Sequence, residues 1–309
     1  MKVLRELNLK NLVFIDIETA SIVEELELDT PLFDSWAYSS SRRDFSNDEL
    51  ILSYKDQAAL QPEFGRIVCI SVGRIVGDKL KIRTYNNQNE KVMLQDFNDD
   101  LEMVTDANPK TVFCGHAAIG FDIPFIFKRC LVNQVEPHYL IDTSGQKPWE
   151  VKTIDTKDLW KNTSWKPVSL INISVALGIP SPKDDISGAD VGRVFWTEGE
   201  KGIQRISRYC EKDVLTTANV VMRCRFEPLL EMDLSGVEIP VEEIPLIRKL
   251  FDGGKYGAEE KKEMKALLKT LSKEDKVKAL VILESIVSGA KGKKTKITKA
   301  HVKALRDGK

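Results

Sequence analysis

The sequence predicts an α/β fold with a mixed sheet flanked by helices, and three observations support this. An apolar run at 12–17, "LVFIDI", has the length and composition of a buried strand. Residues 65–85 contain two β-rich stretches joined around Gly77-Asp78, which is typical of a hairpin. Downstream, segments with helical periodicity alternate with short apolar runs, as expected when helices pack on a sheet.

The remaining elements are expected in this order: helix 90–104, strand 111–115, helix 121–133, helix 168–179 and long helix 202–226. Ser169 is the expected N-cap of the helix at 168–179, and Pro180 and Pro182 end it. Residues 21–63 are rich in charge and are expected to form a long irregular insertion. The tryptophans, Trp160 among them, are expected to anchor the core or loops rather than to stack on bases.

The bulk composition is that of a soluble globular protein, with 42% hydrophobic and 30% charged residues among 309. The sequence contains neither a membrane-length apolar run nor a signal peptide. We therefore expect a cytoplasmic protein without a membrane partner, encoded by a bacterium or a phage. Five cysteines without a C-x-x-C pair argue against a disulfide scaffold or a zinc site, and three histidines argue against histidine-rich metal chemistry.

Charge is distributed unevenly along the chain. Lys255–Lys309 holds 16 basic and 7 acidic residues, a balance of +9, whereas the preceding residues sum to −10. We predict a main domain at 1–228, a linker with a short helix at 229–254, and a small basic helical region at 255–309. The basic region is expected to contact nucleic acid, and docking to a protein partner is the alternative.

Two acids, Asp16 and Glu18, stand at the end of the first apolar run. A strand alternates its faces with a period of two, so both carboxylates point to the same side. Like charges held together repel unless a cation lies between them. If partner acids converge there, the pair indicates a site for a hard metal such as Mg²⁺ or Mn²⁺; otherwise it is a solvated strand end.

Candidate partner acids follow downstream. Asp122 stands where the strand at 111–115 leads into a helix, and a cap of that helix is the alternative role. Tyr209 and Asp213 lie four residues apart on the long helix, and their apolar neighbours predict that this face points inward. An inward Asp without a partner is costly. Together, the four acids have the composition of a two-metal phosphodiesterase site.

The order D-x-E, then F-D after a G-H turn, then Y-x-x-x-D resembles the DEDDy 3′–5′ exonucleases, which have an RNase H-like (DnaQ-like) fold. The stretches "FIDIET", "PEFGRIVCISVG", "GFDIPF", "DTKDLW", "LGIPSPKDDISG" and "YCEKDVLTT" look like predicted exonucleases related to family-B polymerase proofreading domains. The resemblance runs from about Asn11 to Phe226 and does not extend into the basic region.

This resemblance implies roles for individual residues. Two Mg²⁺ or Mn²⁺ ions would be held by Asp16, Glu18, Asp122 and Asp213. Tyr209 would orient the attacking water; the histidine branch has His five residues before the last Asp, where this chain has Arg208. Substrate-binding roles are implied for Thr19, Ala20, His116 and Phe121, and a core role is the alternative for Phe121. The chain departs from the family at Ala117, where Asn is usual, and this departure bears on substrate binding or rate rather than on the metal ligands.

The expected function is that of a stand-alone, metal-dependent 3′–5′ exodeoxyribonuclease. It would act on single-stranded 3′ ends and release nucleoside 5′-monophosphates, and the residues after 226 are too few for a polymerase domain. One alternative is a 3′–5′ exoribonuclease. Another is a catalytically weakened nucleic-acid-binding module, which only Ala117 favours. The sequence leaves open whether the pathway is DNA repair, replication, recombination or phage DNA metabolism.

Overall fold

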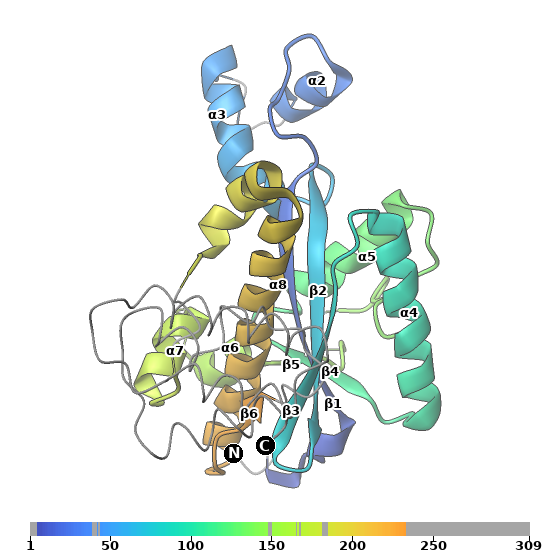
Figure 1. The fold of residues 1–309 in the computed structure, drawn as a ribbon, viewed down its shortest axis with the longest axis vertical. Helices are drawn as coiled ribbons and strands as arrows, with labels where there is room; N and C mark the ends of the chain where they lie inside the picture. Colours follow the sequence, from blue (N-terminus) through green and yellow to red (C-terminus); the bar gives the residue numbers. More distant parts are fainter. Residues whose placement is uncertain are drawn as a thin grey trace, which may run out of the picture. The chain divides into compact units, whose positions relative to one another are not determined.

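The computed structural model describes residues 5–38, 42, 44–147, 150–164, 166, 168–180 and 185–232. Predictions for 233–309, including the basic region and most of the linker, lie outside these described residues. Within them the chain forms a six-stranded mixed sheet in the order β5-β4-β1-β2-β3-β6, with helices on both faces (Figure 1). No helix in this part of the chain combines the length and apolar character needed to cross a membrane.

The central strand, β1 (Leu12–Ser21), confirms the strand predicted at 12–17 and continues four residues further. It pairs antiparallel with β2 (Gly65–Val76) and parallel with β4 (Val112–Gly115). Its pairing with β2 shifts register between Glu18 and Thr19, which marks a β-bulge. The strand that carries both N-terminal acids is therefore held on both sides by neighbouring strands.

The outer strands complete the sheet. The predicted hairpin is confirmed: β3 (Lys79–Tyr85) pairs antiparallel with β2, and Gly77 in the turn has φ +66°, a conformation that favours glycine. Two short strands were not predicted. β5 (Ile154–Asp155) pairs with β4, and β6 (Glu231–Met232) adds an edge strand to β3 inside the range expected to be linker.

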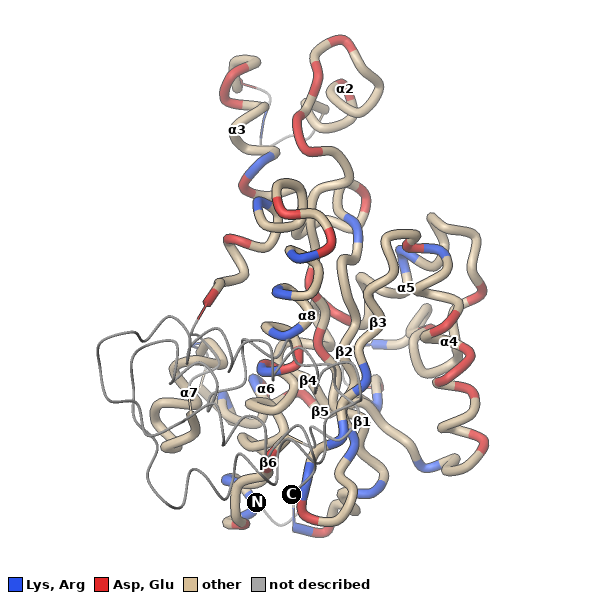
Figure 2. The backbone as a smooth tube through the Cα atoms, in the orientation of Figure 1, with Lys and Arg blue, Asp and Glu red and all other residues tan. Residues whose placement is uncertain are grey.

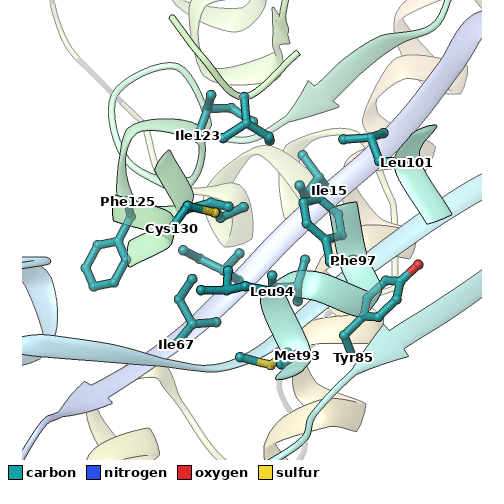
Figure 3. Close-up of a cluster of buried hydrophobic side chains, with 14 of the residues drawn as sticks. Ile15, Ile67, Tyr85, Met93, Leu94, Phe97, Leu101, Ile123, Phe125 and Cys130 are labelled. Carbon is teal, nitrogen blue, oxygen red and sulfur yellow. The ribbon is translucent and has the colours of Figure 1, made fainter. Parts of the chain in front are cut away.

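One face of the sheet packs against α4 (Glu90–Ala107) and α5 (Asp122–Val132), both close to their predicted ranges. Figure 3 shows this core, in which Ile15 and Ile67 from the strands meet Phe97 and Phe125 from the helices. Val13 and Ile17 belong to the same apolar cluster as Ile15. The odd-numbered residues of β1 from 13 to 17 thus face α4 and α5.

The opposite face packs against α8 (Val191–Cys224). Leu12 and Phe14 of β1 share an apolar cluster with Val214 and Ala218 of α8. Because strand faces alternate, Asp16 comes next on this side. The period of β1 therefore directs the first acid toward α8, the helix that carries Tyr209 and Asp213.

The long helix predicted at 202–226 is the second part of α8. Gly199 has φ 58° and ψ −136° inside the element, so the helix is broken there and its first part, from Val191, was not predicted. Between α5 and α8, α6 (Thr156–Lys161) follows β5, and α7 (Leu170–Ala176) begins after the predicted N-cap. The Ser169 hydroxyl accepts a hydrogen bond from the Asn172 N–H. Short 3₁₀ turns occur at Leu9–Asn11, Ala58–Leu60 and Gly188–Asp190.

The prediction that residues 21–63 are irregular was wrong. They contain α2 (Pro31–Ala37) and α3 (Asn47–Gln57), which pack through a small apolar cluster of their own around Trp36 and Tyr54. The Trp36 indole Nε1 donates hydrogen bonds to the Leu50 carbonyl and the Ser53 hydroxyl. We call residues 22–64 the arm. The helix α3 has a sequence signal that was overlooked, the capping box formed by Ser46 and Glu49.

Candidate active site

Three of the predicted acids converge between the sheet and α8. One carboxylate oxygen each from Asp16, Glu18 and Asp213 lies within 4.8 Å of the others. The first two lie inside β1 rather than at the strand end that the sequence predicted, and the third comes from the face of α8 that packs on the sheet. Carboxylate oxygens are the ligands that Mg²⁺ and Mn²⁺ prefer, so the donor set fits a hard divalent cation.

Asp122 lies next to this group without belonging to it. It is the first residue of α5, it is only 3% exposed, and its Oδ1 accepts a hydrogen bond of 3.0 Å from the Ile17 N–H. That bond ties α5 to β1 between the two strand acids. The structure thus places Asp122 against the segment that carries Asp16 and Glu18, with one oxygen engaged by the backbone.

Burial and mutual repulsion dominate the electrostatics of these acids. Burial raises the pKa of Asp16 and of Glu18 well above the usual range, and the charges of neighbouring acids raise both further. Burial also raises the pKa of Asp122 to about 7. Such a cluster tends to bind protons when no cation is present, and a divalent cation would allow the acids to ionise together.

Tyr209 lies one helical turn before Asp213 on α8. Burial raises the pKa of its hydroxyl, and the charge of Asp213 and a hydrogen bond to that residue raise the pKa further. The phenol therefore stays protonated at physiological pH and remains able to donate a hydrogen bond. Tyr209 thus lies beside the acid group, and its role in orienting a water molecule stays a prediction.

Cys210 also contacts the acid group, and no role was predicted for it. Its fully buried Sγ donates to both the backbone O and the Oδ2 of Asp16, each at 3.3 Å. This thiol helps to fix the orientation of that carboxylate. The signal in the sequence was its position inside "YCEKD", between Tyr209 and Asp213.

Asp155, the last residue of β5, holds the loop that leads to Asp122. Its Oδ1 accepts hydrogen bonds from the N–H groups of Ala117 and Lys157, both at 2.9 Å, and its Oδ2 accepts one from the Ile119 N–H at 3.2 Å. Two oxygens of a buried carboxylate thus engage three backbone donors. This residue belongs to the stretch "DTKDLW", and the sequence alone assigned it no role.

The backbone at Ala117 has a conformation that suits the Asn implied at this position by the resemblance. Ala117 has φ +65°, in the left-handed region where Asn is tolerated far better than Ala. The Asp155 carboxylate bonded to its N–H holds it in this conformation. The substitution therefore places strain in the loop that ends at Asp122.

The residues predicted to bind substrate each have intramolecular contacts, and their roles stay predictions. The Thr19 hydroxyl donates to the Ala59 carbonyl at 2.7 Å, and Ala20 is fully buried in an apolar cluster that includes residues of α8. His116 Nδ1 lies 3.0 Å from the Thr156 hydroxyl oxygen. The Phe121 ring packs on the α4–α5 core.

Comparison with known proteins identifies the family of this chain. Residues 58–271 match a family described as "Predicted 3'-5' exonuclease related to the exonuclease domain of PolB". The chain belongs to this family. Members are predicted nucleases, so membership indicates a phosphodiester hydrolase that acts on nucleic acid, and the mixed sheet with flanking helices is that of an RNase H-like exonuclease.

The boundaries of the family match differ from the expected ones. The match begins at residue 58, so Asp16 and Glu18 lie outside it, whereas Asp122, Tyr209 and Asp213 lie inside. It also continues to residue 271, past Phe226, where the resemblance was expected to end. The family therefore reaches into the first part of the basic region.

One similar solved structure is the family B DNA polymerase from the hyperthermophilic archaeon Pyrobaculum calidifontis, at 13% sequence identity and a TM-score of 0.43. The similarity covers 70% of this chain and only 24% of that polymerase. A likeness of this degree carries no information on activity. Among curated proteins no significant match was found.

Proposed function

We propose that this chain is a metal-dependent 3′–5′ exodeoxyribonuclease that shortens single-stranded DNA and releases nucleoside 5′-monophosphates. The observation that carries the proposal is the convergence of Asp16, Glu18 and Asp213 within 4.8 Å, in a chain whose family is that of predicted 3′–5′ exonucleases. Three like charges held this close are otherwise unfavourable, and a cation-binding site accounts for them.

Each residue of the site has a proposed role. Asp16, Glu18 and Asp213 would hold divalent cations, Mg²⁺ or Mn²⁺, and Asp122 beside them would contribute to a second ion. Bound there, a pair of such cations would supply positive charge to the scissile phosphate and lower the pKa of a nearby water. Tyr209 donates a hydrogen bond that orients this water for attack on phosphorus. The Cys210 thiol and the Ile17 N–H hold the carboxylates of Asp16 and Asp122 in place.

A strand labelled at its 5′ end tests the proposal directly. With Mg²⁺ or Mn²⁺ the 309-residue chain alone should shorten it stepwise from the 3′ end. With Ca²⁺ it should bind the strand and cleave little, because the looser coordination of Ca²⁺ misplaces the water. Cuts inside a circular single strand, or activity that survives complete removal of divalent ions, would contradict the proposal.

A matched RNA strand separates the proposed activity from an exoribonuclease. We expect faster turnover on DNA, since family membership relates this chain to an exonuclease domain of a DNA polymerase. Faster turnover on RNA would reassign the substrate without changing the metal chemistry. Binding of either strand with no turnover under any metal would instead favour a weakened binding module.

A further inference from the structure

The helix α6, with the sequence TKDLWK, carries two basic side chains and one aromatic side chain, together with the acid Asp158. Lys157, Trp160 and Lys161 are three and four residues apart, so they share one side of this helix. Trp160 is 37% exposed, so it is not a buried core residue, and its expected role as a loop anchor stays a prediction. We call these three residues the α6 face. Cations interleaved with an exposed aromatic ring are the elements with which proteins bind single-stranded nucleic acid.

This face is anchored to the loop that carries Asp122. The Thr156 hydroxyl, at the start of α6, donates to the Gly115 carbonyl at 3.1 Å and lies 3.0 Å from His116 Nδ1. The Asp155 carboxylate bonds both this loop and the Lys157 N–H. The α6 face is therefore fixed relative to the candidate active site.

The register of the strands shows how far the start of α6 lies from Asp16. Phe14 of β1 is opposite Cys114 of β4, which is opposite Ile154 of β5, and all three strands run parallel. The end of β5, where α6 begins, is therefore level with Asp16 and two strands away. Strands lie about 4.8 Å apart, so the backbone where α6 begins is about 10 Å from the backbone of Asp16, and a strand bound at the acids needs only a few more nucleotides to reach the α6 face.

The distribution of charged residues favours strand binding on the side of the sheet that carries α6. The helix α4, on the other face of the sheet, contains Asp96, Asp99, Asp100, Glu102 and Asp106 against the single base Lys91, while its Glu90 is buried and ion-paired with Arg129. Figure 2 shows the acidic positions of α4 and of the arm, and basic positions recurring along α8, which contacts α6. A polyanion is therefore repelled more strongly from α4 than from the side that carries α6, where basic and acidic residues alternate.

We propose that the α6 face binds the substrate strand next to the scissile bond, with a base stacked on Trp160 and phosphates contacted by Lys157 and Lys161. This rests on the proposed function and specifies how a single strand is held. It also gives a reason for single-strand preference, since a base paired in a duplex does not offer its face to a protein ring.

Stacking is tested with two fluorescent single strands, one natural and one whose last nucleotides before the 3′ end are abasic. Binding is measured by anisotropy with Ca²⁺ in place of Mg²⁺. Trp160→Ala should weaken binding of the natural strand about 5- to 150-fold, the usual range for one stacked base, and change abasic binding little. Trp160→Phe should restore most of the affinity. The neighbouring Leu159, also 37% exposed, supplies the control Leu159→Ala, which should bind like the wild type.

Salt dependence tests the two lysines. Replacing both by Ala should flatten the slope of log affinity against log salt by about 1.4, because each single-strand phosphate contact contributes roughly 0.7. The matched control removes Lys79 and Lys81, which are exposed on β3, and should leave the slope unchanged.

Two results would overturn the α6 assignment. One is that Trp160→Ala weakens binding of the natural and the abasic strand equally, and the other is that the lysine variant keeps the salt slope of the wild type. Hydrolysis by the wild-type chain is measured separately with Mg²⁺. If hydrolysis fails while the binding differences appear, the proposed function is wrong and the α6 face stands as a nucleic-acid-binding surface. If hydrolysis occurs and the binding differences are absent, only the α6 proposal fails.

Discussion

Replacing Asp213 by Asn removes one charge from a group in which carboxylate oxygens lie within 4.8 Å of one another. Two unit charges at that distance repel by about 3.5 kcal/mol at an effective dielectric constant of about 20. Proton uptake by Asp16 and Glu18 relieves part of this repulsion. We therefore expect Asp213→Asn to stabilise the metal-free protein by about 1–3 kcal/mol at alkaline pH, or roughly 2–10 °C in Tm.

The sign of the pH dependence follows from the raised pKa values. A carboxyl whose pKa is higher in the folded state than in the unfolded state costs stability above its unfolded value, near 4. This cost grows as pH rises toward the folded value and then levels off. The metal-free wild type should therefore lose stability relative to the variant as pH increases, and the two should converge in acid.

Thermal unfolding in chelator and in Mg²⁺, together with hydrolysis of a single strand, provides the measurement. Wild type should gain stability from Mg²⁺, because an ion that binds only the folded state stabilises it. The variant should gain much less, and its turnover should fall by roughly 10³-fold or more, since charge stabilisation by a metal is worth several kcal/mol. Asp99→Asn on the exposed side of α4 is the control, and should change neither Tm nor turnover.

Two results would refute the reasoning. The first is an Asp213→Asn variant that responds to Mg²⁺ as strongly as the wild type, because Asp213 then holds no ion. The second is a variant that is less stable than the wild type in chelator at alkaline pH, because repulsion then does not dominate the acid group.

Four further predictions concern other parts of the molecule. Tyr209→Phe should lower kcat by about 10²–10⁴-fold in single-turnover assays while strand affinity stays nearly unchanged; equal turnover would mean that the ring merely packs. Asp155→Asn should cost about 1–3 kcal/mol in denaturant unfolding and raise the Mg²⁺ concentration needed for half-maximal turnover, because buried backbone donors lose a charged acceptor; an unchanged metal requirement would limit this residue to stability. Ala117→Asn should stabilise the fold by about 0.5–1 kcal/mol, measured by Tm, because Asn tolerates the left-handed backbone; a lower Tm would show that the side chain does not fit. Deleting residues 255–309 should flatten the salt slope of strand binding by roughly 0.7 for each phosphate that this segment neutralises, and should spare turnover on short saturating strands; an unchanged slope would favour docking to a protein.

Sequence reasoning worked where the determinants are local. The two-residue period of β1 places Asp16 and Glu18 on one side, and the four-residue spacing of Tyr209 and Asp213 places them on one helical face. These local regularities predict which side chains share a face, and the expectation that the acids meet came from the family resemblance. The hairpin turn at Gly77 was likewise visible, because its backbone conformation favours glycine.

Other features depend on packing between distant segments and left little trace in the sequence. Cys210 contacts Asp16 across 194 positions, and Asp155 bonds Ala117 across 38. A cysteine with apolar neighbours and an Asp before a helix look like an ordinary core residue and an ordinary cap. The arm was missed for a different reason: α2 and α3 are only 7 and 11 residues long, too short for a strong periodic pattern.

The arm leaves and rejoins the sheet at a single rung. Ser21 of β1 is opposite Gly65 of β2, so the arm enters and leaves the sheet at one pair of residues, and it keeps its own apolar cluster. Lengthening such an excursion adds little closure entropy, since each doubling costs only about 0.6 kcal/mol. The arm is thus a site where evolution or an engineer can graft, trim or exchange a module without changing the ladder that sets Asp16 and Glu18 in place. Such a graft must return a carbonyl to the Thr19 hydroxyl where Ala59 now supplies one, and another to the Arg129 guanidinium where Pro62 now supplies one.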